Sequence, residues 1–249
     1  MRSFPPDGDV LSTIMDGWID FYDSAHSIYV NAHHRDVHFR RLAEDLSQYV
    51  RSGAAVLDYG CGEALHADIV AEKAGQLILI EPAPGVRARL SARFGTNTKI
   101  EASGPERLAA LPDHSIDLVI MHSVAQYLTP KELDATLARL RRLLRPDGLF
   151  VLGDVIPPRT SALHDATALL RFGAREGFFF AAIGGLARTT LSSYRQLRSS
   201  LGLTRYDETA LIEKLAAAGF TARRAGHNIG HNQSRMAFLA LPTGSAAWN

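Results

Sequence analysis

The stretch VLDYGCGEA, residues 56–64, reads as a buried strand that runs into a glycine-rich turn and then opens a helix. Gly60 and Gly62 allow tight turning and let a ligand approach the backbone closely. A dinucleotide-binding fingerprint would place a third glycine where Leu65 stands. The turn also follows Asp58, whose carboxylate would repel a pyrophosphate but suits a cationic group such as an ammonium or a sulfonium.

A second acidic residue follows the next apolar run. The run LILI, residues 77–80, ends in Glu81, which stands 21 residues after Gly60. An acid at the tip of the second strand of such a fold can accept hydrogen bonds from both ribose hydroxyls. Together the two signals predict a site for a nucleoside that carries no diphosphate.

Strand-like and helix-like patterns alternate from residue 54 onward. This alternation predicts a mostly parallel α/β sheet, doubly wound, with helices on both faces. The expected strands are residues 54–59, 76–81, 98–101, 116–122 and 149–154, and the expected helices are residues 64–74, 84–94 and 130–144.

The alternation stops after two prolines at positions 157 and 158. Residues 161–203 read as helical, and residues 207–218 form another helix that Gly219 ends. Two last strands are expected at residues 221–227 and 235–241, separated by a turn, and the first 50 residues also have helical spacing.

Four motifs in order resemble the class I S-adenosylmethionine-dependent methyltransferases, in particular their small-molecule, type 11-like branch. The chain is similar to this family over about residues 54–154 and more weakly over residues 206–242. The motifs are the glycine-rich stretch 56–64, the ribose-binding acid Glu81, the fourth-strand run SIDLVI at 115–120 and the turn LRPDGL at 144–149.

The resemblance implies a seven-stranded Rossmann-like sheet of order 3-2-1-4-5-7-6. It also implies one methyltransferase domain, 1–249, in four parts. These are a helical lid at residues 1–50, a cofactor-binding core at 54–157, a helical acceptor cap at 158–205, and a C-terminal helix with a strand pair at 206–242.

The resemblance further implies S-adenosylmethionine as cofactor and S-adenosylhomocysteine as product. Glu106 is the counterpart of an acid that in this family follows the third strand and contacts the adenine amine. Asp117, in contrast, sits early in its strand, so a structural role is expected. The cofactor-binding residues predicted in this way are Asp58, Tyr59, Gly60, Cys61, Gly62, Glu81, Pro82, Glu106, Met121, His122 and Ser123.

The methyl acceptor needs a base only if it must lose a proton. His122 follows the fourth strand, where cofactor and acceptor meet in this family. Tyr22 and His26 lie one helical turn apart in the lid and could face the site together. These three residues are the catalytic candidates, and the irregular spacing of the other lid histidines gives no metal pattern.

The insert at residues 159–205 holds seven arginines against two acids. Phe179, Ile183, Leu186, Tyr194 and Leu197 fall near one helical face. The helix could simply pack on the domain, cap an apolar acceptor with an acidic group, or lie on an anionic membrane through residues 178–198. The last two readings predict a substantially apolar acceptor, and the predicted function is methyl transfer to a small-molecule or lipid-like acceptor.

The composition of the chain narrows the functional classes that remain possible. The net charge is +1, so nucleic acid is not an expected partner, and the single cysteine together with the absence of an apolar leader indicates a cytoplasmic protein. Two alternatives stay open: a catalytically silent cofactor-binding or membrane-adaptor module, and a nicotinamide-dependent oxidoreductase. The atom methylated, through oxygen, nitrogen or carbon, and the oligomeric state stay open as well.

Overall fold

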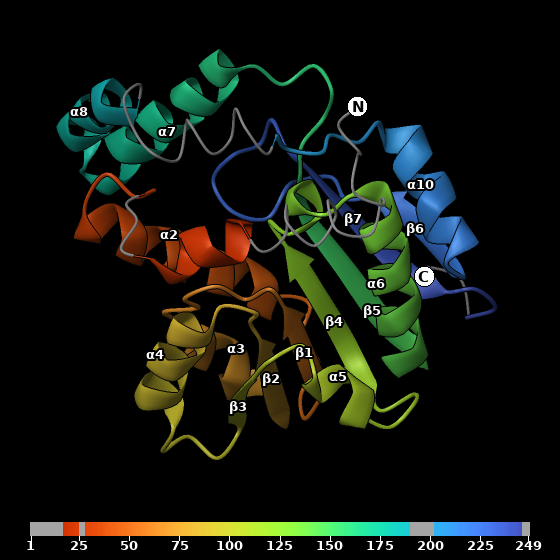
Figure 1. Cartoon of the computed structure of the whole chain (residues 1–249). Coiled ribbons are helices and arrows are strands. Elements are labelled where there is room, and N and C mark those ends of the chain that lie inside the picture. Colours follow the sequence, from red (N-terminus) through yellow and green to blue (C-terminus); the bar gives the residue numbers. More distant parts are fainter. Residues whose placement is uncertain (1–16, 25–27, 190–201, 246–249) are drawn as a thin grey trace, which may run out of the picture.

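A seven-stranded sheet forms the centre of the molecule (Figure 1). The computed structural model describes residues 17–24, 28–189 and 202–245. The strand order is β3-β2-β1-β4-β5-β7-β6, with β7 antiparallel to both its neighbours, which confirms the predicted fold class and order. The strands are β1 (Ala55–Tyr59), β2 (Gln76–Ile80), β3 (Ile100–Ser103), β4 (Ile116–His122), β5 (Leu144–Val155), β6 (Phe220–Arg224) and β7 (Met236–Pro242).

Helices cover both faces of this sheet, as the alternating pattern predicts. One apolar layer joins the sheet to α2 (Ala32–Ser47), α3 (Ala67–Lys73) and α4 (Pro84–Phe94). The opposite layer joins it to α5 (Arg107–Ala110), α6 (Pro130–Leu143) and α10 (Glu208–Ala217). The 3-10 helix η1 (Ala125–Tyr127) follows β4.

Helix α6 shows how local sequence produces one of these elements. Thr129 and Glu132 form a capping box that satisfies backbone donors at the first turn, and Pro130 occupies a position that needs no backbone donor. Leu133, Leu137 and further leucines at helical spacing are completely buried against the sheet. Burying each leucine contributes about 1.5–3 kcal/mol.

Several predicted boundaries are wrong, among them the following. Strand β3 begins at Ile100 instead of residue 98. The turn expected at residues 144–148 belongs to β5, because a bulge sets Ile116 opposite Leu144 and Leu118 opposite Leu149. Strand β6 is shorter than expected and β7 begins one residue later, so residues 225–235 form a loop in place of a short turn between β6 and β7.

The described parts of the lid and the insert are mostly helical. Residues 17–23 form a helix, followed by α2, and the insert contains α7 (Ala162–Glu176) and α8 (Phe179–Thr189). Gly177, in the left-handed conformation with φ +81°, ends α7. Figure 1 shows α7 and α8 stacked over α2, which separates them from the sheet. Tyr194 and Leu197, in the expected apolar face, lie outside the described residues.

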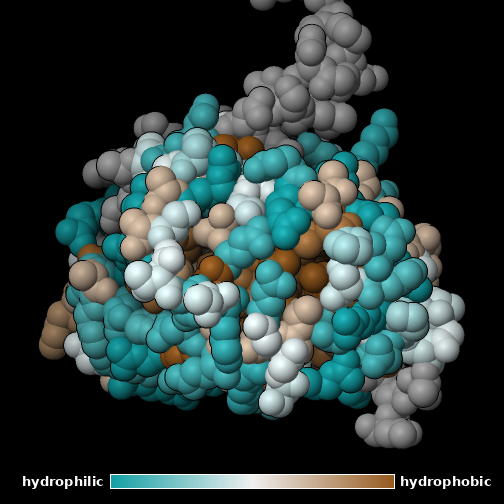
Figure 2. Space-filling view, turned by 90° about the horizontal axis from the view of Figure 1, so that it is seen from below, coloured by the Kyte–Doolittle hydropathy of each residue, from teal (hydrophilic) through white to brown (hydrophobic). Residues whose placement is uncertain are grey.

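The end of the molecule opposite α7 and α8 has a mostly hydrophilic surface (Figure 2). Figure 2 views it from below, where hydrophilic residues predominate and hydrophobic ones appear near the middle. Within the described ranges, no helix is both long enough and apolar enough to cross a membrane.

Candidate functional site

A cavity of about 600 Å³ lies at the carboxyl ends of the central strands. Ligands of open α/β sheets bind at this edge, and the volume is within the range of small-molecule sites. The loops after β1, β2, β4 and β5 form its floor, and the helix at residues 17–23, helix α2 and the loop 225–235 form its walls.

The loop after β1 depends on both of its glycines. Gly60 has φ +74° and Gly62 has φ +58°, conformations that strain any other residue. The Gly60 amide donates to the carbonyl of Ile80 over 2.7 Å. A Cβ atom on Gly60 would lie 2.4 Å from Cγ2 of Val124, whereas one on Gly62 would meet no atom within 4 Å. The loop therefore brings bare backbone to the cavity.

Glu81 braces this loop from the end of β2. Its side chain is 6% exposed, and its two carboxylate oxygens accept hydrogen bonds from the amides of Gly62 and Ala83, each over 2.9 Å. Burial raises the pKa of Glu81, and these two hydrogen bonds oppose that rise. A carboxylate has about four acceptor positions, so it can still accept hydrogen bonds from a ligand in the cavity.

Asp58 lies beside Glu81 at the end of β1. Burial raises the pKa of Asp58 to about 7, and the charge of Glu81 adds to the effect. A buried carboxylate without a counter-charge is unstable in its ionised form. A cation in the cavity would supply that counter-charge, which is the chemistry that the sequence predicts for this position.

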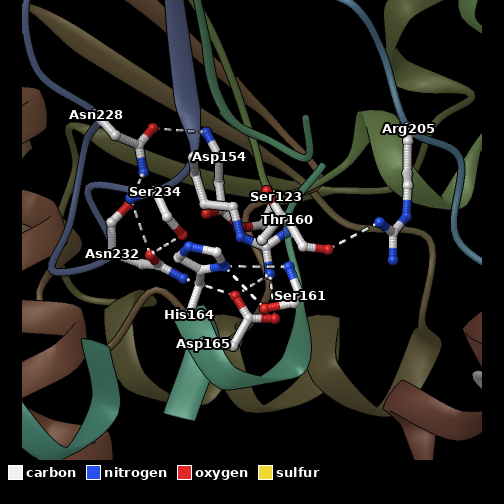
Figure 3. A network of polar contacts seen from close by, with 11 residues as sticks. Ser123, Asp154, Thr160, Ser161, His164, Asp165, Arg205, Asn228, Asn232 and Ser234 are labelled. Carbon is white, nitrogen blue, oxygen red and sulfur yellow. Dashed lines mark hydrogen bonds and ion pairs between the residues drawn. The ribbon is translucent and has the colours of Figure 1, made fainter. Parts of the chain in front are cut away.

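The ends of β4 and β5 hold two strained residues. Ser123 and Asp154 both have φ +58°, a conformation that non-glycine residues rarely adopt and that often marks functional sites. The Ser123 hydroxyl donates to Asp154 Oδ2 over 2.7 Å (Figure 3). It also lies 3.1 Å from His122 Nδ1. His122 Nε2 lies 3.3 Å from the carbonyl oxygen of Ile229. Burial lowers the pKa of His122, which favours its neutral form.

The lid is tied to the core by polar contacts. The hydroxyls of Tyr22 and Tyr127 are 2.6 Å apart. Asp23 accepts a hydrogen bond from the amide of Gly85 over 2.6 Å, at the first turn of α4. Arg35 of α2 forms a two-point ion pair with Glu63, in which both nitrogen–oxygen distances are 2.6 Å. These contacts hold the lid against η1, α4 and the loop after β1.

Most of the predicted site residues meet in this cavity. Of the catalytic candidates, Tyr22 and His122 line it, and His26 lies outside the described residues. The predicted cofactor-binding residues that line it are Asp58, Tyr59, Gly60, Cys61, Gly62, Glu81, Pro82, His122 and Ser123.

Two predicted residues are placed elsewhere. Side chains alternate between the faces of a strand, so Met121 points into the core between β4 and α6 and is completely buried. Glu106 is exposed and folds over Gly104, and its neighbour Pro105 lines the cavity instead. The expected structural role of Asp117 is confirmed, because its carboxylate binds the Ala55 amide and the Arg145 side chain.

The described part of the insert does not place the expected apolar face in the cavity. Phe179 and Ile183 are 38% and 47% exposed, and neither they nor Leu186 lines the cavity. Phe178, at the preceding position, is instead buried against α2 and α7 in a small apolar cluster. The described part of the insert therefore packs on the lid, as the first of the three readings predicts.

Sequence reasoning missed several lining residues. Asp154 could have been found by the rule that identified Glu81, since it is a polar residue at the carboxyl end of a strand. Tyr127, His231 and Arg235 carry no comparable signal, because loops bring them to the cavity. Across the described ranges, no three or more His, Cys, Asp or Glu residues form a group that could hold a metal ion.

Comparison with known proteins agrees with this geometry. A family model for a methyltransferase domain matches residues 57–152. The chain is 31% identical over 199 residues to nocamycin O-methyltransferase of Saccharothrix syringae, covering 76% of this chain and 68% of that protein. It is 28% identical over 225 residues to malonyl-[acyl-carrier protein] O-methyltransferase of Serratia marcescens, covering 88% and 81% of the two chains.

Solved structures share the fold at low sequence identity. A complex of DhpI with S-adenosylhomocysteine has a TM-score of 0.60 at 13% identity, covering 93% of this chain and 98% of that one. The 1,6-didemethyltoxoflavin-N1-methyltransferase of Burkholderia thailandensis, with that substrate and S-adenosylhomocysteine bound, has a TM-score of 0.60 at 17% identity, covering 98% and 93%.

Proposed function

This chain belongs to the class I S-adenosylmethionine-dependent methyltransferases, and on that premise we propose that it methylates an oxygen atom of a small or lipid-like acceptor. The cofactor supplies the electrophile: a lone pair of the acceptor bonds to the methyl carbon, the carbon–sulfur bond breaks, and its electron pair stays on sulfur. The protein's part in such a reaction is positioning and electrostatics.

The proposed cofactor end of the cavity is the part built from β1 and β2. Gly60 and Gly62 give backbone access, and Glu81 accepts hydrogen bonds from the ribose hydroxyls. Asp58 faces the positively charged part of the cofactor, which explains how the fold tolerates a buried carboxylate with a raised pKa. Tyr59, Cys61 and Pro82 complete the wall, together with His122 and Ser123 at the far side.

Oxygen is the proposed methylated atom because two of the relatives, those of Saccharothrix syringae and Serratia marcescens, are named O-methyltransferases. The observation that carries the proposal is that one cavity runs from Glu81 to the loop 225–235, with room beside the cofactor residues for an acceptor. His122 contacts the acceptor in this proposal, and Tyr22 adds to its surroundings from the lid.

The proposed roles of the peripheral segments follow from the same arrangement. Residues 1–50 act as the lid, residues 54–157 as the cofactor core, residues 158–205 as a cap and residues 206–242 as the closing helix and strand pair of one domain. Peripheral membrane contact through residues 178–198 is a secondary proposal, favoured by the exposure of Phe180 (86%) and Ile183 (47%) on α8.

The test uses S-adenosylmethionine carrying a ¹³C-labelled methyl group, incubated with the protein and with lipid and polar extracts in parallel. We expect a new oxygen-bound methyl resonance in the lipid extract. A nitrogen- or carbon-bound methyl would contradict the proposed atom, and label confined to the polar extract would contradict the lipid-like acceptor. Tight cofactor binding without any transfer would favour the catalytically silent module, and tight NADH binding without S-adenosylmethionine binding would favour the oxidoreductase.

A further inference from the structure

Three histidines from distant parts of the sequence meet at one end of the cavity. His34 and His38 lie on α2, and His231 comes from the loop before β7; all three line the cavity. The ring centroids of His38 and His231 are 5.7 Å apart, and those of His34 and His231 are 6.4 Å apart. His231 stacks on Phe172 at 4.5 Å and 9°, and His34 stacks on Phe178 at 4.7 Å and 25°.

The hydrogen-bonding capacity of these rings is largely unused. His34 Nδ1 accepts from the Val30 amide over 3.2 Å, so its hydrogen is on Nε2, which is buried and has no partner among the described residues. Within the same ranges, neither His38 nor His231 donates or accepts a hydrogen bond; His38 meets the ring of His231 edge-on, and His231 stacks on Phe172. Burial lowers the pKa of His34 to about 4 and also lowers the pKa values of His38 and His231, so all three are neutral at pH 7.

Arg235 adds a permanent cation to this end of the cavity. Its side chain is 10% exposed, and its Nη2 contacts the two carboxylate oxygens of Asp165 at 2.8 and 2.9 Å. Its Nε and Nη1 are buried and have no partner in the described part of the chain. Asn232 also donates to Asp165, over 3.0 Å (Figure 3). The guanidinium is thus held in place while two of its nitrogens stay unpaired, an arrangement that destabilises the fold unless a ligand supplies acceptors.

We propose that His34, His38, His231 and Arg235 form the acceptor subsite, and that it takes a flat, unsaturated molecule bearing an oxygen acid, either a carboxylate or an enolate. The inference rests on the proposed function and names its acceptor class. The unpaired groups of His34 and Arg235 are nitrogen–hydrogen donors, which an oxyanion satisfies and an ammonium does not. The stacked rings and the neighbouring Tyr29 give the subsite flat apolar walls.

Asp165 already balances the charge of Arg235, so recognition depends on the unpaired donors and not on a net positive potential. Neutral histidines suit this acceptor. A carboxylate or an acidic enol has already lost its proton at pH 7, so oxygen–carbon bond formation and carbon–sulfur bond cleavage require no proton transfer to the protein.

The test compares two probes of one shape, 2-naphthoate and its carboxamide 2-naphthamide, on the protein loaded with S-adenosylhomocysteine. Isothermal titration calorimetry should show that the carboxylate binds at least about tenfold more tightly than the amide. Because Arg235→Gln alone would leave Asp165 buried without its cation, the double variant Asp165→Asn, Arg235→Gln is used. It should bring the two affinities within about twofold of each other.

Two further variants sharpen the experiment. His231→Phe keeps a ring stacked on Phe172 but removes the ring nitrogens, and should weaken naphthoate binding several-fold. Arg224→Gln is the matched control. Arg224 lies on β6 in an exposed ion pair with Glu208 of α10, and this change should leave the affinities for both probes unaltered. Binding of S-adenosylhomocysteine should be unchanged in every variant, which also shows that each one folds.

Three results would overturn the subsite. They are equal affinity for the two probes, no binding of naphthoate, and a carboxylate preference that survives in the double variant. Failure of the unaltered protein to bind S-adenosylhomocysteine is a different result, because it would contradict the proposed function itself.

Discussion

The two ends of the cavity are built in different ways. The cofactor end comes from one continuous segment, in which Gly62 and Glu81 are 19 residues apart and share a hydrogen bond. The acceptor end joins α2, α7 and the loop 225–235, where the Asp165–Arg235 ion pair alone spans 70 residues. The shape of the cofactor end is determined by backbone conformations that particular residues require. The shape of the acceptor end is determined by how separate segments pack. Substitutions should therefore act differently at the two ends.

The largest effect is expected at Gly60. A valine there would strain the positive φ, and its Cβ would overlap Cγ2 of Val124, a β-branched side chain that cannot easily move. We expect Gly60→Val to weaken S-adenosylmethionine binding at least about 100-fold, equivalent to about 2.7 kcal/mol. Calorimetric titration measures this effect.

Gly62→Ala is the matched control for that substitution. It imposes the same kind of φ strain but meets open space, so a loss of only about tenfold is expected from a strain of about 1–2 kcal/mol. Equal losses in the two glycine variants would contradict the close approach of Val124 as the cause.

Substitution of Glu81 should have the next effect in size on cofactor affinity. Glu81→Gln keeps one acceptor oxygen for the loop amides but loses the charge, and hydrogen bonds to a charged group contribute about 1.5–3 kcal/mol. We expect cofactor affinity to fall about 10- to 100-fold, measured by titration, with thermal stability nearly retained. Glu81→Ala is the less informative change, since it would leave the buried amides of Gly62 and Ala83 without an acceptor. Unchanged affinity in Glu81→Gln would remove the ribose assignment.

Asp58 should make cofactor binding depend on pH. Its pKa is raised to about 7 in the folded protein, so below pH 7 it is protonated, and a bound cation must expel that proton. Affinity should rise between pH 5 and 7 by up to about tenfold per unit and then level off.

Two measurements check this expectation. Titration at pH 6 in buffers of different ionisation enthalpy should reveal a released proton, and Asp58→Asn should release none. The raised pKa of Asp58 also makes the free energy of unfolding of the ligand-free protein depend on pH. The contribution of Asp58 to stability is complete below about pH 4, near the ordinary pKa of Asp, and is lost as the pH rises to 7. A proton release that persists in Asp58→Asn would assign the titration to another group.

The smallest effect on the site is expected at Gly219, far from either end of the cavity. It has φ +85° after α10, where Gly219→Ala should cost about 1–2 kcal/mol of stability. For a chain of this size each kcal/mol lowers the Tm by about 2–4 °C. Scanning calorimetry should show this decrease while cofactor affinity stays unchanged, and a loss of affinity would show that the site and the periphery are coupled.

The sequence by itself determined the sheet, its strand order through family resemblance, and most of the residues that line the proposed cofactor end of the cavity. These features were accessible because each depends on neighbouring residues: alternating patterns define strands and helices, and a glycine or an acid at a strand end has a local meaning. The same local rules also selected Met121 and Glu106, whose side chains are directed away from the cavity by strand alternation and by the turn.

Only the tertiary structure decided the acceptor end. It replaced the expected short turn between β6 and β7 with the loop 225–235, which carries His231 and Arg235 to α2 and α7. It also left Phe179 and Ile183 partly exposed and buried Phe178 against the lid. The physical reason is that stacked rings and buried ion pairs between distant segments depend on packing, which no local pattern of residues encodes.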